Sequence, residues 1–200
     1  TTMEQIILAC QSEYLPIEIA CVISSRADAG GLEKAKKLGI PKKDILVINP
    51  GKFKNRTGKV DQEKFGQKIL KALQSRKVTV ITQNGWLPLT PKNVLREYQD
   101  RIFNQHPGPL PDFGGKGMYG KRVHCAVLLF KRLTECELWT EVIAQRVAEK
   151  YDQGAMVKSK KVKIFPSDTV EDLAQRALAI EHQVQIALLK DYTPHQLKER

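Results

Sequence analysis

Three polar residues have the types and positions needed for acid–base chemistry. Asn104 and His106 lie at the end of a short apolar stretch, and their spacing of two can turn both side chains the same way as the chain leaves a strand. Asp152 lies in the tight sequence Tyr-Asp-Gln-Gly. An aspartate near His106 would hold one imidazole tautomer and raise the pKa of the ring, which would stay protonated near neutral pH. The three residues are therefore a candidate site for hydrogen bonding and proton transfer.

The loop after His106 fits a site that contacts a ligand through its backbone. Pro107, Pro109 and Pro111 stiffen the exit from the strand, and a glycine cluster over 114–117 permits close approach. A simpler interpretation remains open here. Asn-x-His-Pro is a short pattern that occurs mostly in turns, and an aspartate before Gln-Gly is typical of an Asx turn.

Other chemistries lack their sequence patterns. The chain has no nucleophile elbow with a Ser-His-Asp set, no P-loop and no HExxH motif. The histidines lack the spacing of metal ligands, so no metal is expected. His124 is expected to pack in an apolar helix, and His182 to line the last helix. The four cysteines are widely spaced without a CxxC pair, which favours a reducing compartment and a cytoplasmic location.

The elements that position these residues alternate between strand and helix. This order predicts a Rossmann-like α/β fold, with a mostly parallel sheet and helices on both faces. In such sheets ligands bind at the carboxyl ends of the strands, where Asn104 and His106 would lie. The expected strands cover 17–24, 44–48, 78–82 and 101–104, and the expected helices cover 31–38, 60–75, 91–99 and 121–131.

The two ends of the chain depart from this alternation. Strands over 138–147 and 155–164 predict a C-terminal β-hairpin, followed by a long helix that Asp168 caps, with Glu171 as its capping-box partner, and that Pro194 ends. Residues 1–11 read as a helix, although a doubly wound domain usually opens with a strand. We therefore expect a first strand upstream of Thr1, a single domain over 1–192 and a polar tail over 193–200.

Composition excludes several classes of protein. A chain of 200 residues with 42% hydrophobic residues forms a sizeable core, and it contains no apolar run of membrane-spanning length and no visible signal peptide. The net charge is +11, and residues 34–77 alone, with fourteen Lys/Arg and three Asp/Glu, account for it. That stretch holds only Phe53 and Phe65 as aromatic residues, so we favour a solvated face over a nucleic-acid surface. We expect neither nucleic acid nor membrane as a partner.

A series of motifs along the chain favours the functional interpretation of these residues over the simpler one. The motifs are Asn104 to Pro107, Leu110-Pro111, Gly114 to Gly120, Tyr151 to Gly154 and Ser167 to Thr169, together with the segment 24–33. In this order they resemble the phosphoribosylglycinamide formyltransferase family of folate-dependent enzymes in purine synthesis. The resemblance covers essentially the whole chain, and 104–120 is its most specific part. It implies formyl transfer from the cosubstrate 10-formyltetrahydrofolate to the amine of glycinamide ribonucleotide, an anionic ribonucleotide, without a metal.

The resemblance also implies roles for individual residues. Asn104, His106 and Asp152 match the catalytic trio, in which Asn104 and His106 donate hydrogen bonds to a tetrahedral oxyanion and Asp152 assists proton relay. The substrate-binding positions are Thr1 and Thr2, which match the end of a phosphate-binding loop at a helix N-terminus, together with Pro107 and Glu181. The positions that match the folate pocket are Trp86, Leu87, Leu89, Val147 and Tyr151.

Two departures from the family pattern leave the substrate open. The folate-wall segment 85–90 is one residue shorter than usual and lacks the usual arginine. The strand before Asp152 usually carries a small hydroxyl residue and a histidine, and here Ile143 and Gln145 stand in their places. Alternatives are formyltetrahydrofolate hydrolysis, formylation of an amino sugar or of initiator tRNA, and a non-enzymatic basic nucleic-acid-binding module. We expect a monomer or homodimer.

Overall fold

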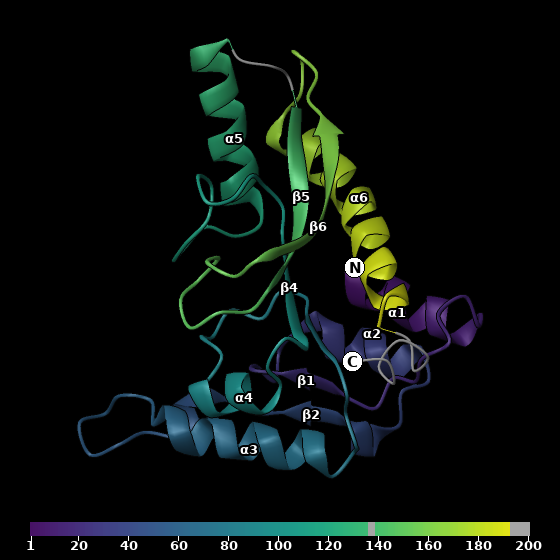
Figure 1. Cartoon of the computed structure of the whole chain (residues 1–200), viewed down its shortest axis with the longest axis vertical. Coiled ribbons are helices and arrows are strands. Elements are labelled where there is room, and N and C mark those ends of the chain that lie inside the picture. The colour runs from purple at the N-terminus through teal and green to yellow at the C-terminus, as the bar shows by residue number, and fades with distance from the viewer. Residues whose placement is uncertain (136–138, 193–200) are drawn as a thin grey trace.

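The computed structural model of the chain describes residues 1–135 and 139–192 (Figure 1). Its helices and strands alternate up to β4, after which a helix, two long strands and a final helix follow. The expected tail over 193–200 and the helix end at Pro194 lie outside the described residues. The elements are α1 (Thr2–Gln11), β1 (Val22–Ser24), α2 (Gly30–Lys37), β2 (Ile45–Val47), α3 (Gln62–Gln74), β3 (Ile81–Gln83), α4 (Lys92–Glu97), β4 (Ile102–His106), α5 (Lys121–Thr134), β5 (Trp139–Arg146), β6 (Met156–Lys163) and α6 (Val170–Lys190).

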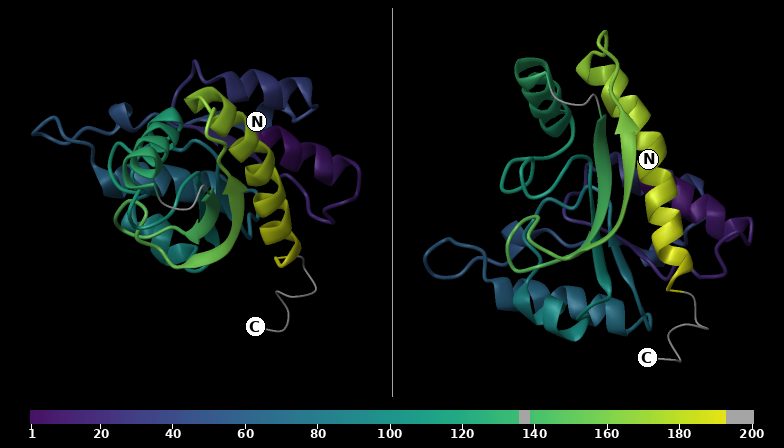
Figure 2. Two further views of the ribbon diagram at one scale, coloured as in Figure 1. Left: turned by 90° about the horizontal axis from the view of Figure 1, so that it is seen from above. Right: turned by 45° about the horizontal axis from the view of Figure 1, so that its top comes forward.

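The strands form two sheets. β1 pairs with β2 in parallel, and β3 pairs with β4 in parallel at the edge of a sheet ordered β3-β4-β5-β6. The pairs β4–β5 and β5–β6 are antiparallel. This arrangement confirms the α/β class, the parallel pairing of the N-terminal strands and the C-terminal hairpin with its long helix, which runs beside β5 and β6 (Figure 2).

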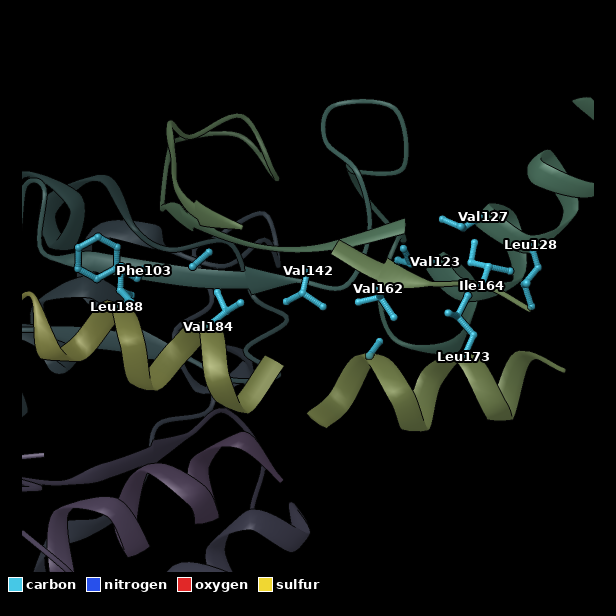
Figure 3. Packing of buried hydrophobic residues seen from close by; sticks show 12 residues of the cluster. Phe103, Val123, Val127, Leu128, Val142, Val162, Ile164, Leu173, Val184 and Leu188 are labelled. Atoms are coloured by element: carbon cyan, nitrogen blue, oxygen red, sulfur yellow. The ribbon is translucent and has the colours of Figure 1, made fainter. Parts of the chain in front are cut away.

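Neighbouring residues of β4 show that helices cover both sides of this strand. Ile102 and Phe103 are both buried, and successive strand residues point to opposite faces. Ile102 packs in a cluster with α3 and α4, whereas Phe103 packs with residues of α5 and α6. Figure 3 shows Phe103 beside Leu188 of α6. β4 is therefore enclosed, and the helices on its two sides fix its position, whereas β6 is largely exposed.

The start of α6 corrects one expectation. Thr169, not Asp168, is the N-cap, and its partner in the capping box is Asp172 instead of Glu171. Asp168 is buried and has a different function: it accepts a hydrogen bond from Phe165 N and forms an ion pair with Arg176 at 2.6 Å. A buried carboxylate needs such partners, whereas the cap position only needs an exposed oxygen near the first helical N–H groups.

Two strands are shorter than expected, and the missing parts face the same space. Residues 17–21 and 78–80 form no strand, although each precedes one. Both segments line a slot of ≈820 Å³ between β1 and β3, with a mainly aliphatic wall. β1 pairs only with β2 and β3 only with β4 among the described residues. A strand needs a hydrogen-bonded neighbour to be regular, so the segments along the slot stay extended but unpaired. The other elements lie within a few residues of their expected bounds.

No helix in the described ranges is both long enough and apolar enough to cross a lipid bilayer.

Candidate active site

A row of three amides crosses the sheet. Gln83 of β3 pairs with Asn104 of β4, which pairs in turn with Gln145 of β5. Residues directly opposite one another share a face of the sheet, so the three side chains lie in one line. All three line a cleft of ≈40 Å³ together with Asp152. Gln83 ends its strand and is fixed by a 2.7 Å hydrogen bond from its Nε2 to Thr90 Oγ1.

His106 and Asp152 meet beside this row. The His106 Nδ1 and Asp152 Oδ2 atoms are 3.6 Å apart, and both side chains are at least nine-tenths buried. His106 therefore lies within about 6 Å of Asp152, as expected, and Asn104 lines the cleft with Asp152, whereas His106 itself is not among the cleft-lining residues. The catalytic role of the three stays a prediction. His106 Nε2 lies 2.8 Å from the carbonyl oxygen of Phe113. Because a carbonyl can only accept, Nε2 carries the proton and Nδ1 faces Asp152.

Two hydrogen bonds hold Asp152 from opposite sides. Its Oδ1 accepts from Gln145 Nε2 at 2.8 Å, and its Oδ2 accepts from Gly115 N at 2.9 Å. The backbone of Asp152 has a φ of 54°, in the left-handed region that aspartate tolerates better than most residues. A Cβ at Gly114 would lie 2.9 Å from the Cβ of Asp152. The glycine cluster thus lets the backbone of its loop come close to another group, and within the protein that group is the Asp152 carboxylate.

The protonation of His106 differs from the sequence-based expectation. Burial lowers the pKa of His106 below its ordinary value, and the Asp152 carboxylate and the Phe113 carbonyl only partly counteract it. The expectation that Asp152 keeps the ring protonated near neutral pH is wrong, because removal from water disfavours the charged form more than the carboxylate favours it. Burial therefore favours the neutral ring, in which Nδ1 carries a lone pair.

A second buried histidine lies near the first. His124 of α5 is 3% exposed, as expected for a packed residue, and its Nδ1 has no hydrogen-bond partner in the described ranges. Burial, with a smaller contribution from the charge of His106, lowers the pKa of His124 to about 4. The site therefore holds two imidazoles that resist protonation.

The proposed substrate-binding residues at the two chain ends come together. Thr2 Oγ1 donates to Glu181 Oε2 at 3.5 Å, and burial raises the pKa of Glu181. Thr1 caps α1 and lines the slot. The slot and the cleft share Gln83, Trp86 and Thr90, so the two hollows adjoin. Pro107 follows His106 directly and lines neither hollow.

The residues matched to a folate pocket surround the cleft. Trp86, Leu89, Val147 and Tyr151 line it, and Leu87 contributes its carbonyl oxygen, which accepts from the Tyr151 hydroxyl at 3.2 Å. The segment 85–90 and the loop 147–152 therefore meet as opposite walls. Sequence reasoning missed Gln83, whose only signal was its place at the end of a short apolar run.

The remaining sequence features add no chemistry to this cleft. No group of three His, Cys, Asp or Glu side chains within the described ranges is arranged to hold a metal ion. Most lysines of the 34–77 stretch are exposed, and the inward-lying Arg76 pairs with Asp44 at 2.9 Å. Its interpretation as a solvated face stays a prediction.

Fold and site together define an α/β domain with a cleft at a strand end, which Asn104 and Asp152 line and beside which His106 is buried against Asp152. The comparisons with known proteins identify its family: a formyl transferase profile matches residues 1–189, and the chain belongs to that family.

Named relatives are similar over most of the chain. It is 32% identical over 198 residues to phosphoribosylglycinamide formyltransferase of Haemophilus influenzae, covering 99% of this chain and 84% of that protein. It is 30% identical over 191 residues to the chloroplastic enzyme of the same name from Arabidopsis thaliana, covering 96% of this chain but only 61% of that protein. The crystal structure of glycinamide ribonucleotide transformylase 1 from Symbiobacterium toebii matches with a TM-score of 0.79 and 28% identity, over 96% of this chain and 81% of that one.

The buried histidines predict a loss of stability in acid. The unfolded state takes up protons at a His pKa of about 6.5, whereas folded His124 takes one up only near pH 4, so unfolding becomes easier as pH falls through this window. Proton uptake at His124 would lower the unfolding free energy by up to about 3 kcal/mol between pH 7 and pH 4. Urea unfolding between pH 7 and 4 should give a shallower pH dependence for His124→Leu than for the parent. Parallel curves for the two proteins would contradict this assignment.

Proposed function

We propose that the chain transfers a formyl group from 10-formyltetrahydrofolate to the amine of glycinamide ribonucleotide, in purine synthesis. The proposal is carried by the placement of Asn104 and Asp152 in one cleft of a formyl transferase family member, with His106 packed 3.6 Å from Asp152. Relatives with at least 30% identity are named for this acceptor. A formyltetrahydrofolate deformylase of Pseudomonas syringae matches at 19% identity, which supports a shared fold and not a shared reaction.

Asn104 provides the electrostatic part of the mechanism. As the amine nitrogen bonds to the formyl carbon, the carbonyl π electrons move to oxygen and a negative charge develops there. The Asn104 amide lies at the cleft beside Gln145 and can donate an N–H to that oxygen. Donors fixed in advance toward such an oxyanion typically contribute about 10²- to 10³-fold in rate.

His106 moves the proton. Its neutral Nδ1 accepts a proton from the attacking amine, directly or through one water, while Nε2–H stays bonded to the Phe113 carbonyl. The resulting imidazolium faces Asp152 at 3.6 Å, and its Nδ1–H becomes a second donor for the oxyanion. His106 then returns the proton to the folate nitrogen as the bond between that nitrogen and the formyl carbon breaks. One N–H is lost and one gained, so the enzyme is unchanged.

The surrounding residues suit the two substrates. Thr1, Thr2 and Glu181 would hold the ribonucleotide beyond the slot, with Pro107 shaping the turn after His106. Trp86, Leu87, Leu89, Val147 and Tyr151 would hold the folate. The Trp86 Nε1–H is buried and finds no acceptor among the described residues, so a polar edge of a bound heterocycle would satisfy it. We place this activity in the cytoplasm, in a monomer or homodimer without a metal.

The slot between β1 and β3 fits a missing strand. We propose that an extended segment leading into Thr1 fills it as a parallel strand and joins the two sheets into one. The slot is bounded on both sides by strands with parallel partners, its wall is mainly aliphatic, and Thr1 lies on it. A strand placed there would reach β1 through α1 by the right-handed crossover that parallel sheets require. The domain would then extend upstream of Thr1.

Replacement of the catalytic trio tests the reaction. His106→Ala should lower kcat by about 10²- to 10⁴-fold, because it removes the proton acceptor. Asp152→Asn should also lose most activity, because the imidazolium loses its counter-charge. Turnover is measured with 10-formyltetrahydrofolate and glycinamide ribonucleotide, with thermal melting as a folding check. Asp112→Asn, an exposed aspartate in the loop after Pro111, is the matched control. Activity retained by a folded His106→Ala protein would refute the assignment.

The hydrogen bond between Tyr151 and Leu87 predicts a change in folate association. A cleft of ≈40 Å³ is smaller than ligand pockets of about 300–1,000 Å³, so its two walls must separate before a folate enters. Tyr151→Phe removes the bond between the walls, worth about 1 kcal/mol, and should speed association about fivefold. Stopped-flow tryptophan fluorescence measures the rate, with Leu133→Gln, on the exposed face of α5, as control. An unchanged rate would argue against a closing role.

A peptide in trans tests the slot. A Val/Ile hexapeptide with two N-terminal lysines should bind and raise Tm, because a buried parallel strand is aliphatic throughout and ligands of the native state stabilise it. The same peptide with proline at its centre should not, because proline removes a ladder donor. Titration calorimetry and melting give the result. Equal behaviour of the two peptides, or dimerisation of the chain through the slot, would overturn the proposed occupant.

A further inference from the structure

Gln145 is a buried side chain whose two polar atoms have different environments. The residue is 2% exposed and lies in β5 opposite Asn104. Its Nε2 donates to Asp152 Oδ1 at 2.8 Å. Its Oε1 is also buried but finds no hydrogen-bond donor in the described parts of the chain. The amide therefore has one strong partner, and that partner is the candidate catalytic carboxylate.

The unsatisfied oxygen indicates what this side chain is for. A buried acceptor without a donor destabilises the fold, and leucine has a similar volume and no such atom. Nε2 must face Asp152, because a carboxylate oxygen accepts, and Oε1 is turned away as a result. A residue selected for packing alone would avoid this arrangement. Within the described ranges, the bond to Asp152 is the one side-chain hydrogen bond that offsets it.

The position of Asp152 shows what the bond does. Gln145 and Gly115 bind the two carboxylate oxygens, and Oδ2 stays 3.6 Å from His106 Nδ1, beyond ordinary hydrogen-bond length. The carboxylate is thus near enough to stabilise an imidazolium but is held short of a direct bond. An amide does not titrate, so this restraint is the same at every working pH.

We propose that Gln145 is a positioning residue that holds Asp152 at this distance from His106. The proposal deepens the proposed function and rests on it for its catalytic meaning. Without the Gln145 donor, the carboxylate can rotate onto His106. A direct ion pair would then hold the proton on the imidazole, and release of that proton to the leaving nitrogen would slow.

Gln145→Leu separates this role from a structural one. We expect kcat to fall on the order of 10- to 100-fold, as for a catalytic group displaced by about an ångström, with KM little changed. The pKa of His106, followed by NMR, should rise, because the carboxylate approaches the ring. Thermal melting checks folding, because the variant removes one unsatisfied acceptor but also leaves Asp152 Oδ1 without its donor. A side chain that only fills space would leave both kcat and the pKa of His106 unchanged.

Two further variants complete the test. Gln145→His restores an N–H donor to Asp152 and should recover most of kcat at pH 8. Thr140→Val is the matched control, because Thr140 is fully buried in the same strand and its hydroxyl also lacks a partner among the described residues. Its kcat and the pKa of His106 should equal the parent values.

The outcomes distinguish the proposals. Parental kcat in Gln145→Leu, or a His106 pKa that is unchanged or lower, overturns the positioning role. A parent protein that transfers no formyl group, combined with a raised His106 pKa in Gln145→Leu, overturns the proposed function but leaves the restraint on Asp152 established.

Discussion

The antiparallel register between β4 and β5 is the constraint on which the site depends. It sets Asn104 against Gln145 and His106 against Ile143. Because side chains alternate between faces, a slip of one residue would turn Gln145 away from Asn104 and leave Asp152 without its Oδ1 donor. The turn that carries Asp152 begins a few residues after this ladder, so the register also determines where the carboxylate reaches the imidazole.

Packing on both faces makes that register robust. Phe103 and Val142 belong to the core beneath α6, and Ile102 belongs to the core beside α3 and α4. A shift of β4 would expose Ile102 and Phe103 to water or force them into occupied space. Adjacent residues of one strand thus separate two tasks: apolar side chains lock the strand in place, and the residues that follow point polar groups into the cleft. The polar groups of the site are therefore held in place by apolar side chains that are buried outside the cleft.

The order of elements and the position of the trio could be read from the chain because they depend on local signals. The spacing of Asn104 and His106 and the turn around Asp152 are sequence features, and a parallel sheet brings strand ends together. The protonation of His106 could not be read in this way, since it depends on how much water the fold removes from the ring. The partners of Asp168 and the shortening of the strand over 17–24 could not be read from local sequence either, because both depend on residues far away in the chain. The one local signal of Gln83, its place at the end of a short apolar run, gained meaning only when β3 was placed beside β4.

Gln83, Trp86 and Thr90 form the wall between the slot and the cleft. An occupant of the slot would press on one side of these residues and a ligand in the cleft on the other. Any free energy by which the first ordered them would appear as tighter binding of the second, and linkage requires the reverse effect to be equal in size. Completion of the sheet and binding of the substrate would then be thermodynamically coupled, so that each strengthens the other.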